Sequence, residues 1–373
     1  MTSPRILLAA GGTGGHLFPA EALAGALLGR GYAVDLVTDE RGTGFAGKLS
    51  SVPVHRIASG GIAGKGIGAR VGNYGRLMLG FVQSRSLLKR LKPTVAVGFG
   101  GYPSLPPILA AQWGSIRTVV HEQNAVAGRA NRVLMKRANR VALSFDTVRH
   151  TEALPAAKKI VTGNPVRAAV SAIQPYVAPS PEGPLNLLVF GGSQGARVFG
   201  RVTPPAIAQL PTALRERLKL VQQVRREDVE ETTKAYRDMG LLAELSPFFK
   251  DMPARYEWAH LIVCRSGASS VAEIAACGRP ALMIPLPNAI DDHQRANARS
   301  LGDKGAGWVL DENDCSPQSL AERLTAILSD PEGLQRAADT ARSLARVDAA
   351  ERLADVVSGL AENTTVNTTG EAH

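Results

Sequence analysis

The sequence has few cysteines, few aromatic residues and no long apolar run. Cysteine accounts for three of 373 residues, and this odd number without a C-x-x-C pair favours a reducing compartment and buried thiols over a disulfide framework. No stretch approaches the roughly 18 to 20 apolar residues that a membrane-spanning helix needs. The apolar run after Arg5 is too short for the core of a signal peptide. These absences predict a packed, soluble, cytoplasmic protein.

Acidic residues are missing from one long segment. Between Glu40 and Glu122 there are eleven Lys or Arg and no Asp or Glu. Residues 1–180 hold 22 Lys or Arg against 7 Asp or Glu, a net charge of +15, whereas residues 181–373 hold 21 against 26, a net charge of −5. An anionic partner is therefore expected for the first half, either nucleic acid or an anionic membrane surface.

A basic amphipathic helix is predicted within this segment. In "IGARVGNYGRLMLGFVQSRSLLKRLKP" apolar residues recur at helical spacing between basic ones. That mixture favours a membrane interface, because nucleic-acid binding would require more aromatic side chains among the basic ones. The alternative is an ordinary surface helix whose apolar stripe packs in the core. The predicted membrane patch consists of Arg76, Leu77, Met78, Phe81, Arg85, Lys89 and Arg90.

One pattern occurs twice and organises the chain. "ILLAAGGTGGHLFPAEALAGAL" at residues 6–27 and "LNLLVFGGSQGARVFG" at residues 185–200 each lead from an apolar strand through glycines into a helix. Short β-branched runs alternate with Ala/Leu-rich helical runs after each copy, which predicts parallel sheets built from βαβ units. We therefore predict an α/β fold with two Rossmann-like domains whose parallel sheets face each other across a cleft, with ligands beyond the carboxyl ends of the strands.

Composition also suggests where the domains begin and end. We expect a first Rossmann-like domain over residues 1–170, a stiff, exposed, proline-rich linker over 171–185 and a second Rossmann-like domain over 186–345. Residues 346–362 are predicted to form a C-terminal helix that returns towards the first domain. The last residues, 363–373, are predicted to be a disordered tail.

The first glycine-rich turn matches neither familiar phosphate motif. Read from Gly12, G-x-G-x-x-G fails at Leu17, and the lysine of a P-loop is absent. The turn could still present free N–H groups to an anion at the start of a helix, or it could be a tight structural turn. His16 is the only ionisable side chain in it, and it could serve as a general base or merely as a cap or surface residue.

Three later motifs carry polar side chains at predicted strand ends. "HEQNAVAGRANR" suggests recognition of a hydroxyl-rich ligand, with a polar loop as the alternative. In "CRSGASSVAEIAACGRP", Ser270 and Glu273 match a capping box, but the same helix start could hold a diphosphate and a ribose. In "IPLPNAIDDHQRANA", adjacent Asp291, Asp292 and His293 point to different faces of a helix and lack further ligands, so no metal site is predicted.

These stretches together resemble the MurG family, the UDP-N-acetylglucosamine transferases that convert lipid I to lipid II in bacterial peptidoglycan synthesis. The resemblance covers nearly the whole chain. It rests, in the order of the family, on "GGTGGHLFPA", "VGFGGYPSLPPILAA", "HEQNAVAGRANR", "TGNPVR", "GGSQGA", "CRSGASSVAEI" and "IPLPNAIDDHQRANA". It implies the GT-B fold, with the nucleotide sugar mainly against the C-terminal domain and the lipid acceptor against the N-terminal one.

The resemblance also implies roles for individual residues. The UDP-N-acetylglucosamine contacts would be Thr13, Gly14, Gly15, Asn124, Arg167, Ser193, Phe249, Ala268, Ser269, Ser270, Glu273 and Gln294. Glu273 would hold the ribose, and Phe249 would lie by the uracil at a position where the family motif has isoleucine. The acceptor side would include Tyr102, Glu122 and Asn297, and His16 would be the catalytic base.

The implied reaction is an inverting transfer of N-acetylglucosamine to the C4 hydroxyl of the lipid-linked N-acetylmuramoyl sugar, with UDP as leaving group and no metal or other cofactor. The implied partners are UDP-N-acetylglucosamine, lipid I and an anionic membrane surface, without nucleic acid, at the cytoplasmic face of the inner membrane. The alternatives are a UDP-N-acetylglucosamine 2-epimerase, another GT-B lipid glycosyltransferase, a NAD-dependent oxidoreductase and a non-catalytic nucleic-acid-binding protein.

Overall fold

The chain folds into two compact units. The computed structural model describes residues 3–11, 14–40, 47–60, 67–192 and 196–369. Contacts divide the chain into Met1–Val166 with Arg346–His373 as the first unit and Arg167–Ala345 as the second. The division thus falls ahead of the expected linker 171–185, and this segment belongs to the second unit. There Tyr176 is buried, and the buried Arg279 donates a hydrogen bond to the carbonyl of Gln174 at 3.1 Å.

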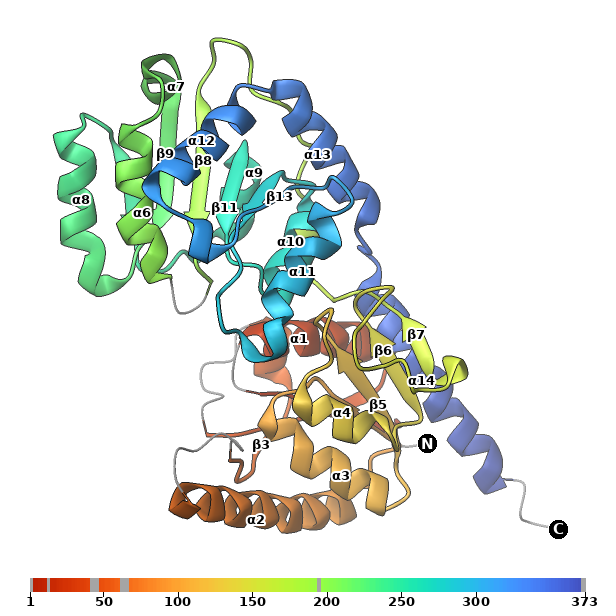
Figure 1. Ribbon diagram of the computed structural model, residues 1–373. Helices are drawn as coiled ribbons and strands as arrows, with labels where there is room; N and C mark the ends of the chain where they lie inside the picture. Colours follow the sequence, from red (N-terminus) through yellow and green to blue (C-terminus); the bar gives the residue numbers. More distant parts are fainter. Residues whose placement is uncertain (1–2, 12–13, 41–46, 61–66, 193–195, 370–373) are drawn as a thin grey trace. The chain divides into compact units, whose positions relative to one another are not determined.

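The first unit contains a parallel sheet that, in the described residues, has seven strands in the order β3-β2-β1-β4-β5-β6-β7 (Figure 1). These strands are apolar and almost fully buried near the centre of the sheet, as expected where helices cover both faces. They are β1 (Arg5–Ala9), β2 (Ala33–Thr38), β3 (Val54–Arg56), β4 (Val95–Gly98), β5 (Arg117–Glu122), β6 (Arg140–Leu143) and β7 (Lys159–Val161).

Helices cover both faces of this sheet (Figure 1). Each face has its own apolar core. One core joins the sheet to α1 (Gly14–Gly29), η1 (Gly47–Ser51) and α14 (Ala349–Thr369), through residues such as Leu27 and Leu353. The other joins it to α2 (Ile67–Leu91), α3 (Leu105–Trp113) and α4 (Arg129–Met135). Two short turns, η2 (Tyr102–Ser104) and η3 (Ala156–Lys158), complete the unit.

Helix α14 extends further than the sequence predicts. Its backbone is helical to Thr369, so the expected disordered tail, residues 363–373, begins inside a helix. Its buried residues Leu353, Ala354, Val357 and Ala361 occupy positions i, i+1, i+4 and i+8 of one helix face and form the stripe that packs in the first unit. Residues 370–373 lie outside the described part of the chain.

The second unit repeats the architecture with a parallel sheet in the order β10-β9-β8-β11-β12-β13. Its strands are β8 (Leu185–Phe190), β9 (Leu218–Gln223), β10 (Ala243–Ser246), β11 (Leu261–Cys264), β12 (Ala281–Met283) and β13 (Trp308–Val309). Its helices are α5 (Ala168–Ser171), α6 (Arg197–Ala208), α7 (Thr212–Arg217), α8 (Val229–Asp238), α9 (Met252–Trp258), α10 (Ala268–Cys277), α11 (His293–Gly302), α12 (Pro317–Leu328) and α13 (Pro331–Leu344). Short turns are η4 (Arg226–Asp228), η5 (Ile290–Asp292) and η6 (Glu312–Asp314).

The strand order reverses at the same place in both sheets. In each one the first strand in sequence lies between the second and the fourth, namely β1 between β2 and β4, and β8 between β9 and β11. Ligands of open α/β sheets bind outside the carboxyl ends of the strands at such a switch point. The glycine-rich turns after β1 and β8 begin there. The predicted pair of Rossmann-like domains is confirmed, and the three cysteines are free and buried, as predicted.

Candidate functional site

The first unit places His16 in a slot lined by glycines. Gly14 and Gly15 open α1, and Thr13 lies outside the described residues. The His16 ring packs against the turn after β4, because a Cβ added at Gly101 would lie 3.3 Å from His16 Cδ2 and 3.4 Å from Nε2. Gly101 has a φ of +73°, which disfavours any residue with a Cβ. The two glycine turns at this switch point therefore fit around one imidazole.

His121, at the end of β5, is a buried neutral imidazole. Its Nδ1 accepts a hydrogen bond from Gln123 Nε2, and its Nε2 donates to the carbonyl of Gly163, both at 3.1 Å. Gln123 also donates to the carbonyl of Phe99 at 2.8 Å, which fixes the orientation of its amide. Burial, with a smaller contribution from nearby His16, lowers the pKa of His121 to about 4. His121 is therefore uncharged near neutral pH and adds no positive charge beside His16.

Glu122 is fully engaged inside the first unit. One carboxylate oxygen accepts hydrogen bonds from the backbone N–H and side-chain amide of Asn124, at 2.9 and 3.2 Å. The other accepts from the backbone N–H of Gly128 at 2.9 Å and from Asn131 Nδ2 at 2.8 Å. Glu122 is 1% exposed. Its carboxylate thus joins the end of β5 to the start of α4 and orients Asn124.

The four residues of "HEQN" differ in exposure. His121, Glu122 and Gln123 are buried and hydrogen-bonded within the unit, so they organise the loop, and the acceptor-side role of Glu122 stays a prediction. Asn124 is partly exposed. Tyr102, the first residue of η2, is also partly exposed and follows the Gly101 turn. Of the polar residues predicted for the acceptor side of this unit, Tyr102 is therefore accessible and Glu122 is not.

In the second unit, α10 begins at the carboxyl end of β11 without a capping box. The N-cap residue is Gly267, and no side chain caps the helix. The capping-box alternative for Ser270 and Glu273 is therefore wrong. Ser269 and Ser270 lie in the first turn and are partly exposed, while Ala268 is buried. The start of α10 consequently presents backbone N–H groups beside two hydroxyl groups, an arrangement that favours an anion.

Glu273, one turn further along α10, is held by two partners. Its Oε1 accepts from Nε of Arg167 at 2.9 Å, and the Nη2 of that guanidinium lies at the same distance. Its Oε2 accepts from the hydroxyl of Tyr256 at 2.9 Å. Burial, reinforced by the Glu273 carboxylate, raises the pKa of Tyr256 well above its ordinary value, so this hydroxyl remains a donor. Two residues predicted separately as donor contacts, Arg167 and Glu273, therefore form one charged pair.

Two residues of α11 form hydrogen bonds with the loop after β12 and with the segment that precedes α10. Gln294 accepts through Oε1 from the backbone N–H of Leu286 at 3.0 Å, and its carbonyl accepts from the Ser266 hydroxyl at 2.8 Å. Asn297 is 0% exposed and donates to the carbonyl of Ser266 at 3.1 Å. Asn297 thus supports the chain at Ser266, and its acceptor-side role stays a prediction, while Gln294 is partly exposed.

The turn after β8 is held by Gln223, a residue outside the motifs identified in the sequence. Ser193 lies outside the described residues, but Gly191 and Gly192 are both hydrogen-bonded to the side chain of Gln223, the last residue of β9. Phe249, predicted beside the uracil, is 7% exposed, and the guanidinium of Arg255 lies 5.0 Å from its ring centre. In the sequence, the available signal for Gln223 was a pair of glutamines near the end of the apolar run "LKLVQQV".

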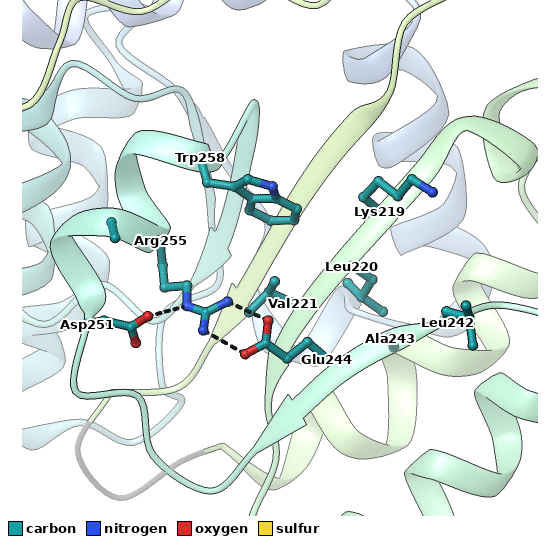
Figure 2. Close-up of a pocket in the computed structure, with 10 residues that line it drawn as sticks. Lys219, Leu220, Val221, Leu242, Ala243, Glu244, Asp251, Arg255 and Trp258 are labelled. Carbon is teal, nitrogen blue, oxygen red and sulfur yellow. Dashed lines mark hydrogen bonds and ion pairs between the residues drawn. The ribbon is translucent and has the colours of Figure 1, made fainter.

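A pocket of about 610 Å³ lies beside this region, at β9, β10 and α9 (Figure 2). Three of its charged side chains are paired with one another, since Arg255 contacts Glu244 at 2.5 and 2.6 Å and Asp251 at 3.0 Å. None of the predicted substrate contacts lines it. In the described residues, no group of three or more His, Cys, Asp or Glu side chains is arranged to hold a metal ion.

Helix α2 has residues that pack against the core and residues that are exposed. Leu77 and Phe81 pack partly against the core, and Leu87 and Leu88 are buried. A different set of large apolar residues is exposed: Tyr74, Met78, Leu79 and Val82 on α2, and Trp113 at the end of α3. Arg76, Lys89 and Arg90 are exposed and Arg85 is partly exposed. The described residues contain no helix with the length and apolar character to cross a membrane.

Comparisons with known proteins match the whole architecture. The glycosyltransferase family 28 N-terminal domain matches residues 6–143, and the glycosyltransferase family 28 C-terminal domain matches residues 186–353. The chain belongs to glycosyltransferase family 28. Curated relatives show that it belongs, within that family, to the MurG group. A UDP-N-acetylglucosamine--N-acetylmuramyl-(pentapeptide) pyrophosphoryl-undecaprenol N-acetylglucosamine transferase from Paramagnetospirillum magneticum is 49% identical over 362 residues, 96% of this chain and 98% of the relative.

Two further comparisons agree. The transferase of the same name from Rhodospirillum rubrum is 51% identical over 360 residues, 96% of this chain and 92% of the relative. The crystal structure of Acinetobacter baumannii MurG aligns with a TM-score of 0.77 and 32% identity over 95% of this chain and 99% of that one. The resemblance to the MurG family is thereby confirmed, together with the GT-B fold. A UDP-N-acetylglucosamine 2-epimerase structure, at 14% identity and a TM-score of 0.64, shares the fold alone.

Proposed function

We propose that this chain is an inverting hexosyltransferase that moves N-acetylglucosamine from UDP-N-acetylglucosamine to the C4 hydroxyl of the N-acetylmuramoyl sugar of lipid I, forming lipid II. The observation that carries the proposal is an identity of about one half, over nearly the full length, to relatives named for this transfer. Retention of the motif residues at the switch points of both sheets supports it.

The second unit supplies most of the donor contacts in this proposal. The start of α10, with Ser269 and Ser270, takes the diphosphate, because the positive end of the helix dipole stabilises nearby negative charge by roughly 0.3 to 1 kcal/mol. As UDP departs, charge grows on the same diphosphate, so these groups also stabilise the leaving group. Glu273 accepts the ribose hydroxyls, and the guanidinium of Arg167 keeps its carboxylate in place.

The first unit supplies the base. An oxygen–carbon bond forms between the acceptor's C4 hydroxyl and the anomeric carbon, the bond from that carbon to the diphosphate breaks, and the hydroxyl proton passes to His16. Attack from the face opposite UDP inverts the anomeric centre. Neutral His121 favours this role, because a second imidazolium beside His16 would disfavour its protonated product. Glu122, hydrogen-bonded to four donors, keeps Asn124 oriented.

The proposal is tested by supplying UDP-N-acetylglucosamine with and without a lipid I analogue while following UDP release. Release that depends on the acceptor is expected. Epimerisation of the free donor, or an absence of turnover with both substrates present, would contradict the proposal.

We also propose that α2 docks the protein on the anionic cytoplasmic face of the inner membrane, where the lipid acceptor resides. Tyr74, Met78, Leu79 and Val82 expose apolar surface on a helix that also carries exposed Arg76, Lys89 and Arg90. Trp113 lies against the same helix, with its ring 5.9 Å from that of Phe81. Apolar side chains that enter the interface next to basic side chains that attract anionic lipid constitute an interfacial site.

Charge reversal on α2 should weaken this binding. Arg85→Glu, Lys89→Glu and Arg90→Glu together should lower the partition coefficient onto phosphatidylglycerol vesicles by about 10²-fold, because each basic residue near an anionic leaflet contributes about 1 kcal/mol. Sedimentation of the protein with such vesicles measures the effect, and salt should reduce wild-type binding in the same assay. The matched control is Arg226→Glu, Lys234→Glu and Arg237→Glu, the same charge change on exposed residues of the second unit. Equal binding by the two triple variants would contradict the docking proposal.

A further inference from the structure

The side chain of Gln223 bridges the ends of three neighbouring strands. It is 5% exposed and stands at the carboxyl end of β9, which lies between β8 and β10. Its Oε1 accepts from the backbone N–H of Gly191, directly after β8, at 3.0 Å. Its Nε2 donates to the carbonyl of Gly192 and to the carbonyl of Pro247, directly after β10, each at 3.0 Å.

These contacts allow one orientation of the amide. The oxygen faces an N–H group and the nitrogen faces two carbonyl groups, so exchanging the two ends would place like groups against each other in all three contacts. A side chain that is almost completely buried and uses both amide groups in this way holds its neighbours at a defined separation. The backbone it holds includes Gly192, which has a φ of +84°.

The two segments that Gln223 joins belong to different parts of the proposed donor site. Gly191 and Gly192 lead into Ser193, which the family resemblance assigns to the donor. Pro247 precedes Phe249, which it places by the uracil. The far side of the second segment is fixed separately, because Arg255 covers the Phe249 ring and is itself held by Glu244 and Asp251. Gln223 therefore connects this segment to the described part of the glycine turn, Gly191 and Gly192.

We propose that Gln223 is a positioning residue that sets the spacing between the glycine turn after β8 and the base-binding segment after β10. At this spacing, one UDP molecule can contact both segments at once. This inference rests on the proposed function, since it requires that the second unit bind UDP. Gln223 itself touches no substrate in this account. Its effect is on the fit of a ligand that spans both segments, and a ligand that reaches only one of them depends on it much less.

Two variants separate positioning from general stability. Gln223→Met removes all three hydrogen bonds at similar side-chain volume. Gln223→Glu retains the acceptor for Gly191 but sets carboxylate oxygen against the carbonyls of Gly192 and Pro247. Both should raise the Kd for UDP about tenfold or more, with the larger effect for Glu, while changing the Kd for uridine less than threefold. Isothermal titration calorimetry with UDP and with uridine gives both values.

Gln222→Met is the matched control. Gln222 is the preceding residue of β9, is 0% exposed, and uses its amide to bond Tyr236 and the carbonyl of Phe199 in the core. It should lower the melting temperature at least as much as Gln223→Met and leave the UDP Kd within twofold of wild type. A wild-type UDP Kd in both Gln223 variants would overturn the inference alone. A wild-type protein that binds no UDP would overturn the proposed function and the inference with it.

Discussion

Replacing His16 by alanine should lower the turnover number by about 10² to 10⁴, the usual contribution of a positioned general base. The donor Kd should change by less than about threefold, because the imidazole acts on the acceptor's proton and the donor is held mainly by the second unit. The residual rate would come from donor binding and from stabilisation of the departing diphosphate. Steady-state kinetics at saturating donor, with UDP affinity measured separately, resolve the two effects.

Two further variants test whether an effect on turnover is specific to the His16 imidazole. His150→Asn removes an exposed imidazole from the same unit and suits a backbone φ of +66°, so it should leave turnover unchanged. Gly101→Ala places a methyl group against the His16 ring and should lower turnover while His16 itself is retained. If His16→Ala turns over at the wild-type rate, His16 is not the base.

Changing Glu273 to glutamine should raise the Kd for UDP by roughly 10- to 100-fold, the cost of removing one member of a partly buried, hydrogen-bonded charge pair. The amide leaves the guanidinium of Arg167 without its carboxylate and accepts ribose hydroxyls less well. The effect should depend on the sugar. Wild-type protein should prefer UDP to 2′-deoxy-UDP, and Glu273→Gln should lose most of that preference.

Tyr256→Phe supplies the graded comparison for Glu273. It removes one neutral donor to Oε2 and retains the pair with Arg167, so it should weaken UDP binding less than Glu273→Gln does. Calorimetric titrations with the two nucleotides measure both variants. If Glu273→Gln preserves the discrimination between UDP and 2′-deoxy-UDP, the carboxylate does not read the ribose, and its role is confined to holding Arg167.

The sheets and their turns were predictable because they depend on local pattern. A short apolar run followed by glycines and a helical period forms a strand-turn-helix unit, and two copies of it predict two parallel sheets. Within each sheet, parallel strands bring their carboxyl ends to one edge. The position of His16 in the first unit and that of the α10 start in the second unit each follow from this pattern. The buried cysteines follow from composition.

The roles of individual polar side chains were harder to predict because burial depends on what folds over them. Glu122 has the residue type of a ligand contact, but Gly128 and Asn131 from the start of α4 surround its carboxylate. Asn297 is similarly covered near Ser266. Ser270 and Glu273 have the spacing of a capping box, yet the N-cap residue of the helix is Gly267, three residues before Ser270.

For helix α2, the sequence did not predict correctly which apolar residues are exposed. Its period correctly indicates an apolar stripe that includes Leu77 and Phe81, but both pack partly into the core. The exposed apolar residues Tyr74, Leu79 and Val82 lie off the predicted patch. Periodicity identifies which residues share a face of a helix, whereas the neighbouring elements decide which face is covered.

The central claim is that this chain joins one N-acetylglucosamine to lipid I for each UDP released. It is tested most directly by incubating the wild-type protein with UDP-N-acetylglucosamine and a lipid I analogue, and by measuring UDP and the lipid product in the same samples by mass spectrometry. We predict equal amounts of UDP and of a lipid heavier by one N-acetylhexosamine, and UDP formation that falls to background without the lipid. UDP formation at the same rate without the lipid, or a lipid of unchanged mass, would contradict the account.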